Sequence, residues 1–413
     1  MTLIDQYVVP KKFNMLSLAL MAVGVLSIII LFITHGSSSN QHVAARFWAS
    51  LLANSVYFLL VVNAVMFFIV ATTLAWGGWQ RSFSRVSEAI STCVPVIGVI
   101  ALFVLLALIF GNNHVIYHWA DDHAQGDPAL VGKSGFLNKP FFVIWTIITI
   151  VGWWLLGKKI RSLSRSIDDR PLSVEEGKKY IWTNTVWAAI YAVLFALTVL
   201  SSIPWLWLMS IDAHWFSTMY SWYTFASSFV AGIALITLFV IYLKNSGYLE
   251  LVTKEHLHDL GKFMFAFSIF WTYLWFSQFM LIWYANIPEE TIYFKQRVQG
   301  PYRGIFFLNL IINFLAPLLL LMKRASKRNY GTLTMMAVLI LFGHWLDFYQ
   351  MVMPTAVMNP ETKLTHVPNM LADFGIALGF VGLIMFVTVR SLARHPLTAK
   401  NHPFLKESII HHT

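Results

Sequence analysis

Residues 47–76 read FWASLLANSVYFLLVVNAVMFFIVATTLAW, a run without a single Asp, Glu, Lys or Arg. About 20 apolar residues are enough for a helix to cross the hydrocarbon of a bilayer. A transmembrane strand would alternate apolar and polar residues, and this run does not. Nine other stretches have the same character, so the sequence predicts ten spanning helices. With residues 47–76, they are 13–34, 86–110, 140–157, 180–203, 222–243, 263–286, 304–322, 333–353 and 369–390.

The composition predicts the same fold class, an all-α integral membrane protein. Of the 413 residues, 58% are hydrophobic and only 12% are charged, whereas a soluble domain carries about 25% charged residues. A water-soluble enzyme and a disordered chain are therefore excluded. Cys93 is the single cysteine, which excludes an internal disulfide, a cysteine-ligated iron–sulfur cluster and haem attached through C-x-x-C-H.

The lysines and arginines predict the orientation of the chain. With ten helices both termini lie on one side, and that side holds 22 of the 29 Lys and Arg residues. Because cytoplasmic loops are enriched in these residues, we expect both termini in the cytoplasm. The net charge of +10 is then a topology signal, and no nucleic-acid partner is expected. The apolar core after Lys11-Lys12 is too long for a signal peptide, so we interpret the first span as uncleaved.

Two loops on the opposite, outer side are longer than a helix connection needs. Residues 111–139 contain three His, and residues 204–221 contain Pro204-Trp205-Leu206-Trp207, which suits a short helix in the membrane interface. These loops either dock an extracytoplasmic partner or only cover helix ends. The predicted organisation is 1–46 (N-terminal tail, first helix and first outer loop), 47–203 (helices 2–5), 204–221 (outer interfacial loop), 222–353 (helices 6–9) and 354–413 (helix 10 and C-terminal tail).

Ionisable residues inside the apolar spans are costly, so they are the first candidates for function. His344 and Asp347 share a helix face at spacing i, i+3, with Gln350 further along it and Pro354 expected to end the helix. A carboxylate beside an imidazole can relay a proton or bind a quinol hydroxyl. The alternative is a buried pair that only fixes helix packing. The full set of candidates is Glu88, His344, Asp347 and Asp373.

Neutral polar residues and outer histidines are weaker candidates. Asn54, Gln278, Asn309 and Asn313 fall in the outer halves of their spans, where they either line an outward-opening cavity or bond helices together. His114, His118 and Asp121, followed by Asp122 and His123, could bind zinc. Interfacial contacts to a quinol headgroup or a docked partner are the favoured interpretation. Only His344 lies deep in a span, so no haem with two intramembrane histidine ligands is expected. Gly375-x-x-x-Gly379 predicts the close approach of another helix.

Two motifs resemble a known family. Residues 127–140, DPALVGKSGFLNKP, and residues 344–354, HWLDFYQMVMP, are similar to the smaller polysulphide-reductase-like (NrfD-like, ActF-like) membrane subunit of bacterial alternative complex III. The resemblance covers nearly the whole chain. It implies two four-helix bundles, helices 2–5 and 6–9, with helices 1 and 10 peripheral. It also implies four partners: a larger NrfD-like sister subunit, an extracytoplasmic iron–sulfur subunit, multihaem cytochrome c subunits and a terminal oxidase.

The resemblance implies a function in the bacterial inner (cytoplasmic) membrane. The chain would be a subunit of a quinol:cytochrome c, or quinol:oxidase, oxidoreductase that oxidises menaquinol. Haem c and iron–sulfur clusters would belong to partner subunits, and this chain alone would bind no cofactor. It would scaffold the outer subunits and contribute a quinol site or a proton path. The rival functions are a secondary transporter, which usually has paired broken helices at mid-depth, and a structural anchor without chemistry.

Overall fold

The computed structural model describes residues 5–111, 114–121, 126–357 and 369–412, and these ranges contain helices and loops but no strand. Ten helices in these ranges are long and apolar enough to cross a membrane. The chain is therefore an all-α, multi-pass integral membrane protein, as the sequence predicts. The spans are formed by α1 (Lys11–Leu31), α2 (Gln41–Leu74), α3 and α4 (Ser84–Ser91, Cys93–Phe110), α6 (Lys139–Arg165), α7 (Val174–Leu197), α9 (Met219–Asn245), α10 (Lys254–Ala285), α12, η7 and α13 (Arg303–Leu310, Ile311–Leu315, Ala316–Leu321), α14 (Tyr330–Val357) and α15 (Leu371–Leu392).

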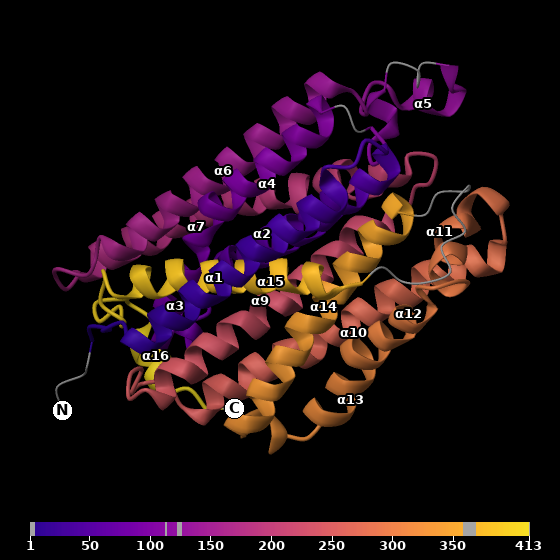
Figure 1. Ribbon diagram of the computed structural model, residues 1–413. Coiled ribbons are helices and arrows are strands. Elements are labelled where there is room, and N and C mark those ends of the chain that lie inside the picture. Colours follow the sequence, from indigo (N-terminus) through magenta and orange to yellow (C-terminus); the bar gives the residue numbers. More distant parts are fainter. Residues whose placement is uncertain (1–4, 112–113, 122–125, 358–368, 413) are drawn as a thin grey trace.

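The helices form two bundles of four spans each, as expected. Helices α2, α4, α6 and α7 pack together, and α9 packs with α10 and α14, which also contact α12 and α13. Helix α2 contacts both α9 and α14, so it joins the bundles (Figure 1). In the most apolar windows of α2 and α9, 89% of residues are buried, against 22% in α1. The centre of the protein is therefore the seam between α2 and the second bundle.

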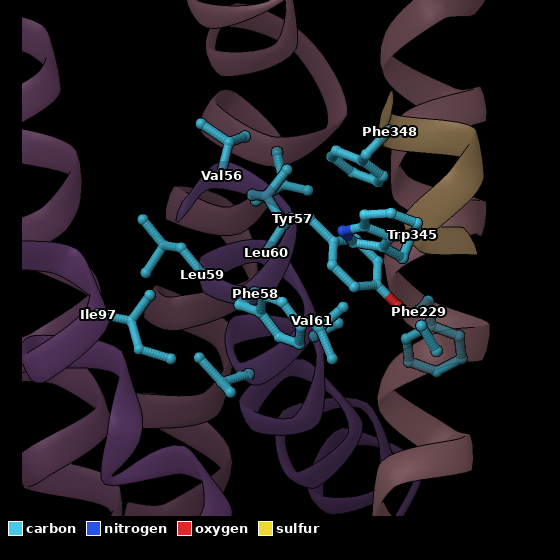
Figure 2. Packing of buried hydrophobic residues seen from close by; sticks show 14 of the residues in the cluster. Val56, Tyr57, Phe58, Leu59, Leu60, Val61, Ile97, Phe229, Trp345 and Phe348 are labelled. Atoms are coloured by element: carbon cyan, nitrogen blue, oxygen red, sulfur yellow. The ribbon is translucent and has the colours of Figure 1, made fainter. Parts of the chain in front are cut away.

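Aromatic and branched side chains fill this seam. Figure 2 shows Val56, Leu59 and Leu60 of α2 among the packed residues, with Ile97 of α4 beside them. On the other side of α2, the ring of Tyr57 lies 5.1 Å from that of Phe348. The Tyr57 hydroxyl donates to the Leu341 carbonyl at 2.7 Å. In hydrocarbon a buried hydroxyl without a partner is costly, so this bond fixes where α14 lies against α2.

Small residues bring the two peripheral helices into close contact. A Cβ added to Gly379 of α15 would lie 2.7 Å from the Cα of Gly24 in α1, and Gly375 lies against Ser27 in the same way. Helix–helix association in lipid relies on such close backbone packing because no hydrophobic effect drives it. The helix approach predicted from the G-x-x-x-G motif is confirmed.

One local prediction is wrong, for a hydrogen-bonding reason. Helix α14 continues through Pro354 to Val357. Proline has no N–H for the carbonyl four residues earlier, but the guanidinium of Arg297 donates to that Gln350 carbonyl at 3.0 Å. A short helix does form in the following loop, α8 (Ile203–Trp207), and its Trp207 is 0% exposed. The indole N–H of Trp207 donates to Thr146 at 2.9 Å, so the buried ring keeps a hydrogen-bond partner.

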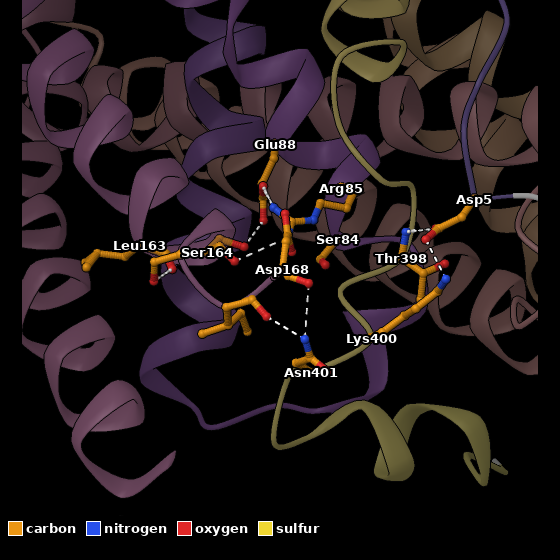
Figure 3. A network of polar contacts seen from close by, with 12 residues as sticks. Asp5, Ser84, Arg85, Glu88, Leu163, Ser164, Asp168, Thr398, Lys400 and Asn401 are labelled. Carbon is orange, nitrogen blue, oxygen red and sulfur yellow. Dashed lines mark hydrogen bonds and ion pairs between the residues drawn. The ribbon is translucent and has the colours of Figure 1, made fainter. Parts of the chain in front are cut away.

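The C-terminal tail closes the face that carries both termini. Ser408 of α16 (Leu405–Ile409) bonds to the backbone and hydroxyl of Ser82, below the first bundle. His411 bonds to Asp259 of the second bundle at 2.5 Å. Asp5 bonds to Thr398 and Lys400, so the two terminal segments lie together (Figure 3). The tail therefore joins both bundles on this face.

The contact between α1 and α15 gives a stability prediction. Gly379→Ala places a methyl group against the α1 backbone, and we expect it to cost about 1–3 kcal/mol because the helices must separate. Gly304→Ala is the control, since no atom lies within 4 Å of an added Cβ there. Thermal unfolding of the purified variants in detergent measures the difference. Equal melting temperatures for the two variants would contradict the close packing.

The docking of the C-terminal tail is expected to depend on pH through His402. This side chain is 7% exposed, and burial together with Arg81 and Arg85 lowers the pKa of its imidazole to about 2. In the undocked tail the pKa of this histidine is about 6.5, so above that pH His402 is neutral in both states and docking keeps its full stability. Below it, docking should weaken by up to about 1.4 kcal/mol per pH unit.

Hydrogen exchange of residues 396–412 at pH 7.5 and pH 5.5 measures this effect. We expect protection to fall at the lower pH in the wild type and to fall less in His402→Gln, whose amide still accepts a hydrogen bond. All other titratable groups are the same in both proteins, so the comparison isolates His402. Unchanged protection of the wild type at the lower pH would show that His402 protonation does not control the tail.

Candidate functional site

The carboxylate of Asp347 is the centre of the polar network in the second bundle. Its Oδ1 accepts hydrogen bonds from the hydroxyl of Tyr223 and the amide of Asn309, the latter at 2.8 Å. Its Oδ2 accepts from Ser227 at 2.8 Å and from the indole of Trp271 at 2.9 Å. Asp347 is 0% exposed. Four donors on two oxygens suit the ionised form, because a protonated acid would have to give up one of them.

Ser227 connects this carboxylate to His344. The serine oxygen lies 2.9 Å from Nδ1 of His344 and 2.8 Å from Oδ2 of Asp347, while the direct distance between these two groups is 3.8 Å. A serine has one hydroxyl proton. When it donates that proton to Asp347, it must accept one from His344. The predicted pair is therefore a three-residue chain in which a hydroxyl joins the imidazole to the carboxylate.

The other side of His344 lies in an apolar setting. Its Nε2 is buried without a hydrogen-bond partner among the described residues. The ring meets the indole of Trp271 edge to face, with centroids 5.4 Å apart. Buried polar atoms usually have partners, so an unpaired imidazole nitrogen at this depth calls for a functional explanation. It leaves one proton-accepting atom free at the end of the chain.

A small polar cavity adjoins Asp347. Its volume is about 20 Å³, slightly above the roughly 10–15 Å³ that one water molecule needs. Gln278, Arg297 and Gln350 line it with Asp347. Two of the lining atoms, Nε2 of Gln278 and Oε1 of Gln350, are buried without a protein partner. The cavity thus has the size and the polar groups to hold a single water beside the carboxylate.

Arg297 of α11 (Pro288–Val298) brings a positive charge to this cavity. The side chain is 2% exposed and donates to the carbonyls of Tyr293, Gln350 and Met351. Its guanidinium stacks 3.4 Å from the centre of the Tyr293 ring. Helix α11 lies in the connection between two spans, so hydropathy gave no sign that Arg297 would be buried. Arg297 thus brings its charge to the cavity that Asp347 also lines.

The spans around the site depart from regular α-helix at this point. Residues Ile311–Leu315 form a π-helical turn between α12 and α13. This turn lies between Asn309 and Pro317, and Asn313 within it donates to Asn309 at 2.6 Å. A Cβ on Gly343 of α14 would collide with the Asn313 side chain. π-Turns occur often at functional sites, and here the turn carries Asn313, which supports the Asn309 that donates to Asp347.

Asp373, a predicted relay residue, belongs to a separate ion pair. Both of its oxygens accept from the guanidinium of Arg46 in α2, one of them at 2.7 Å. The two residues are 0% and 3% exposed. Arg46 directly precedes the apolar run of the second span, which is why the sequence gave no reason to pair it with α15. A bidentate pair of this kind holds α15 against α2.

Glu88 lies at the other end of the protein, in the first bundle. It accepts from Arg85 at 2.9 Å and from Ser164 at 2.5 Å (Figure 3). Arg85 also binds Asp168, whose backbone carbonyl accepts from Asn401 of the tail. Glu88 is therefore neutralised within its own cluster, and among the described residues no contact joins it to the Asp347 network. The structure does not bring the four predicted ionisable residues together.

The outer histidines form a stack with the second outer loop. The ring of His118 lies parallel to that of His214 at 5.5 Å, and His214 binds Asp127 at 2.5 Å. Burial and the neighbouring His214 lower the pKa of His118. His114 is half-buried with an unpaired Nδ1. The described residues contain no group of three or more potential metal ligands, and the predicted Asp122 and His123 lie outside the described ranges.

The neutral polar residues were predicted with partial success. Asn309, Asn313 and Gln278 gather around Asp347 or its cavity, whereas Asn54 accepts from Trp345 at 2.9 Å. The sequence gave no signal for Tyr223 and Ser227, although their spacing i, i+4 places both on one face of α9. Serines and aromatic residues are common in spans, so only the carboxylate opposite distinguishes this pair.

The fold and this buried network define a multi-pass membrane protein with an ionisable centre in its second bundle. Comparison with models of known protein families gives no match, and a search of curated proteins finds no relative. The functional assignment therefore rests on the chain's own residues.

The ion pair of Arg46 and Asp373 gives a prediction that distinguishes a structural role of Asp373 from a role in proton relay. Asp373→Ala leaves a buried guanidinium unpaired and should cost about 3–5 kcal/mol. The double variant Arg46→Met/Asp373→Leu removes both charges and should recover most of that loss. Thermal unfolding in detergent provides the measurement. A double variant as unstable as Asp373→Ala would contradict a purely structural pair.

Proposed function

We propose that this chain is the membrane subunit of a quinol-oxidising respiratory complex of the alternative complex III type, and that it moves protons through Asp347. The observation that carries the proposal is the buried chain of His344, Ser227 and Asp347, because hydrocarbon-depth ionisable groups in contact are rare and characteristic of proton pathways. The motif that resembles the family, residues 344–354, contains two of these three residues.

The chemistry of the chain is a short proton relay. His344 first takes a proton on its free Nε2 and becomes an imidazolium. The imidazolium then gives its Nδ1 proton to Ser227 while Ser227 gives its hydroxyl proton to Asp347, so one proton reaches the carboxylate and the imidazole is left neutral. A water held in the cavity beside Asp347 would carry the proton on past Gln350. No electron is transferred within this chain.

The partners follow from the same proposal. Electrons from menaquinol pass through haem c and iron–sulfur clusters of the neighbouring subunits, beside the larger sister subunit. The outer loops, with His114, His118 and Asp121, form the contact surface for the extracytoplasmic subunits. Both termini lie in the cytoplasm, because the lysine- and arginine-rich face carries them. The complex is placed in the bacterial cytoplasmic membrane.

The structural anchor is the second candidate, and the same geometry favours it. Asp347 accepts bonds from α9, α10 and α12, so it could serve only to hold the bundle together. The two roles differ in what Ser227 does. A packing role requires only that a side chain fills the space at position 227, whereas a relay requires the hydroxyl proton of Ser227.

Ser227→Ala is therefore the decisive variant, and Ser228→Ala is its matched control. Both serines are 0% exposed on α9, but the Ser228 hydroxyl donates only to the Phe225 carbonyl. In the complex purified through this chain and placed in vesicles, we expect Ser227→Ala to lower proton movement per quinol oxidised at least tenfold, since a positioned proton carrier contributes about 10²–10⁴-fold. Ser228→Ala should leave it unchanged.

Two outcomes would contradict the proposal. Proton movement in Ser227→Ala equal to that in Ser228→Ala would leave only the anchor. A chain that purifies in mild detergent without haem c and without iron–sulfur protein would contradict the assignment to a quinol-oxidising complex, whatever the role of Asp347.

A further inference from the structure

A large apolar crevice lies on the other side of α14 from the polar network. Its volume is about 760 Å³, and it lies between α9, α14 and α15 with α2 at its base. Tyr57, Phe58, Val61 and Trp345, labelled in Figure 2, form its deep wall. Its lining shares no residue with the cavity beside Asp347. The crevice is therefore a separate feature of the fold.

The contents of this crevice must be hydrocarbon. Ligand sites usually measure about 300–1,000 Å³, so the space is far too large to stay empty inside a bilayer. Its walls are almost entirely apolar, and water occupies a cavity only where polar groups can bind it. Val338 on the rim is 52% exposed, which leaves the crevice accessible from the surrounding lipid. A lipid chain can enter sideways from the membrane.

The deep end of the crevice offers nothing to a polar headgroup. The hydroxyl of Tyr57 is already bonded to the Leu341 carbonyl, and the indole N–H of Trp345 is bonded to Asn54. A quinol that entered ring first would bury two hydroxyl groups without partners, at a cost of a few kcal/mol each. The occupant must therefore be apolar at its inner end and carry any polar group at the mouth.

The mouth of the crevice lies at the basic face of the protein. Asn245, Thr334 and Phe13 line that end. Lys11 and Lys12 directly precede Phe13 and are exposed, as is Arg390. Helices α1 and α15 are antiparallel, and the contact of Gly24 with Gly379 sets a register that brings the two lysines level with Arg390. Three cations thus lie at the level where a phospholipid headgroup would sit.

We propose that this crevice binds one acyl chain of an anionic phospholipid, whose phosphate rests among Lys11, Lys12 and Arg390. The apolar crevice has room for the acyl chain, and the three cations match the negative charge of the headgroup. Basic pockets between transmembrane helices on the cytoplasmic side bind anionic headgroups in this way. The lipid joins α14 to α15, two helices from different parts of the fold. The proposal does not depend on quinol oxidation or on Asp347.

Lipid retention by the purified full-length chain tests the proposal. The chain is exchanged into detergent with equal amounts of phosphatidylglycerol and phosphatidylcholine of identical acyl chains, and retained lipid is counted by native mass spectrometry. We expect about one phosphatidylglycerol per chain, and a loss of at least fivefold in Lys11→Ala/Lys12→Ala. The control is Lys178→Ala/Lys179→Ala, an exposed pair at the start of α7, which should retain the lipid.

A second set of variants tests the crevice itself. Ala377→Leu fills it from α15, and Val338→Phe fills it from the lipid-exposed rim, where folding tolerates a larger side chain. Each should reduce retention of the lipid while the melting temperature stays near that of the lipid-free wild type. Equal retention of the two phospholipids, retention unchanged by both filling variants, or recovery of a quinone in place of the phospholipid would each overturn the proposal.

Discussion

A buried carboxylate must be surrounded by donors, and this requirement organises the second bundle. Asp347 on α14 receives hydrogen bonds from α9, α10 and α12, so each of the other three spans of the bundle is tied to one side chain. In hydrocarbon a lost donor could be replaced only by the single water that the adjoining cavity can hold. The π-turn in the eighth span and the tight contact at Gly343 place Asn313 beside Asn309, the residue of that span that donates to Asp347.

In the first bundle, the polar side chains at mid-depth are neutral and bond to one another. At mid-depth, the hydroxyl of Tyr191 bonds to Asn63 at 2.5 Å, and the indole of Trp153 bonds to Thr198 at 3.1 Å. Neither pair can release or take up a proton at ordinary pH. The charged cluster around Glu88 lies at the end of this bundle and is closed by Arg85. Of the two bundles, the second is thus the one that the proposed proton relay uses.

The sequence predicted the spans and the key pair but not their surroundings. Hydropathy predicted the ten helices because a run of about 20 apolar residues is typical of a membrane span. The i, i+3 spacing placed His344 beside Asp347. The sequence prediction treated Asp373 and Asp347 as equivalent, because nothing in the neighbouring sequence shows that Arg46 neutralises Asp373 and not Asp347. Ser227, which bonds to both His344 and Asp347, and Arg297, which caps α14 past Pro354, act through contacts between distant segments. Such contacts leave no periodic signal.

The protonation of Asp347 during turnover tests the central claim most directly. Infrared difference spectra of the assembled complex, recorded with and without quinol, report the C=O stretch of a carboxylic acid. The relay predicts that a band sensitive to deuterium exchange appears on quinol addition and is absent from Asp347→Asn. A carboxylate that stays ionised throughout turnover, with no such band in the wild type, would contradict it and leave Asp347 as a packing centre alone.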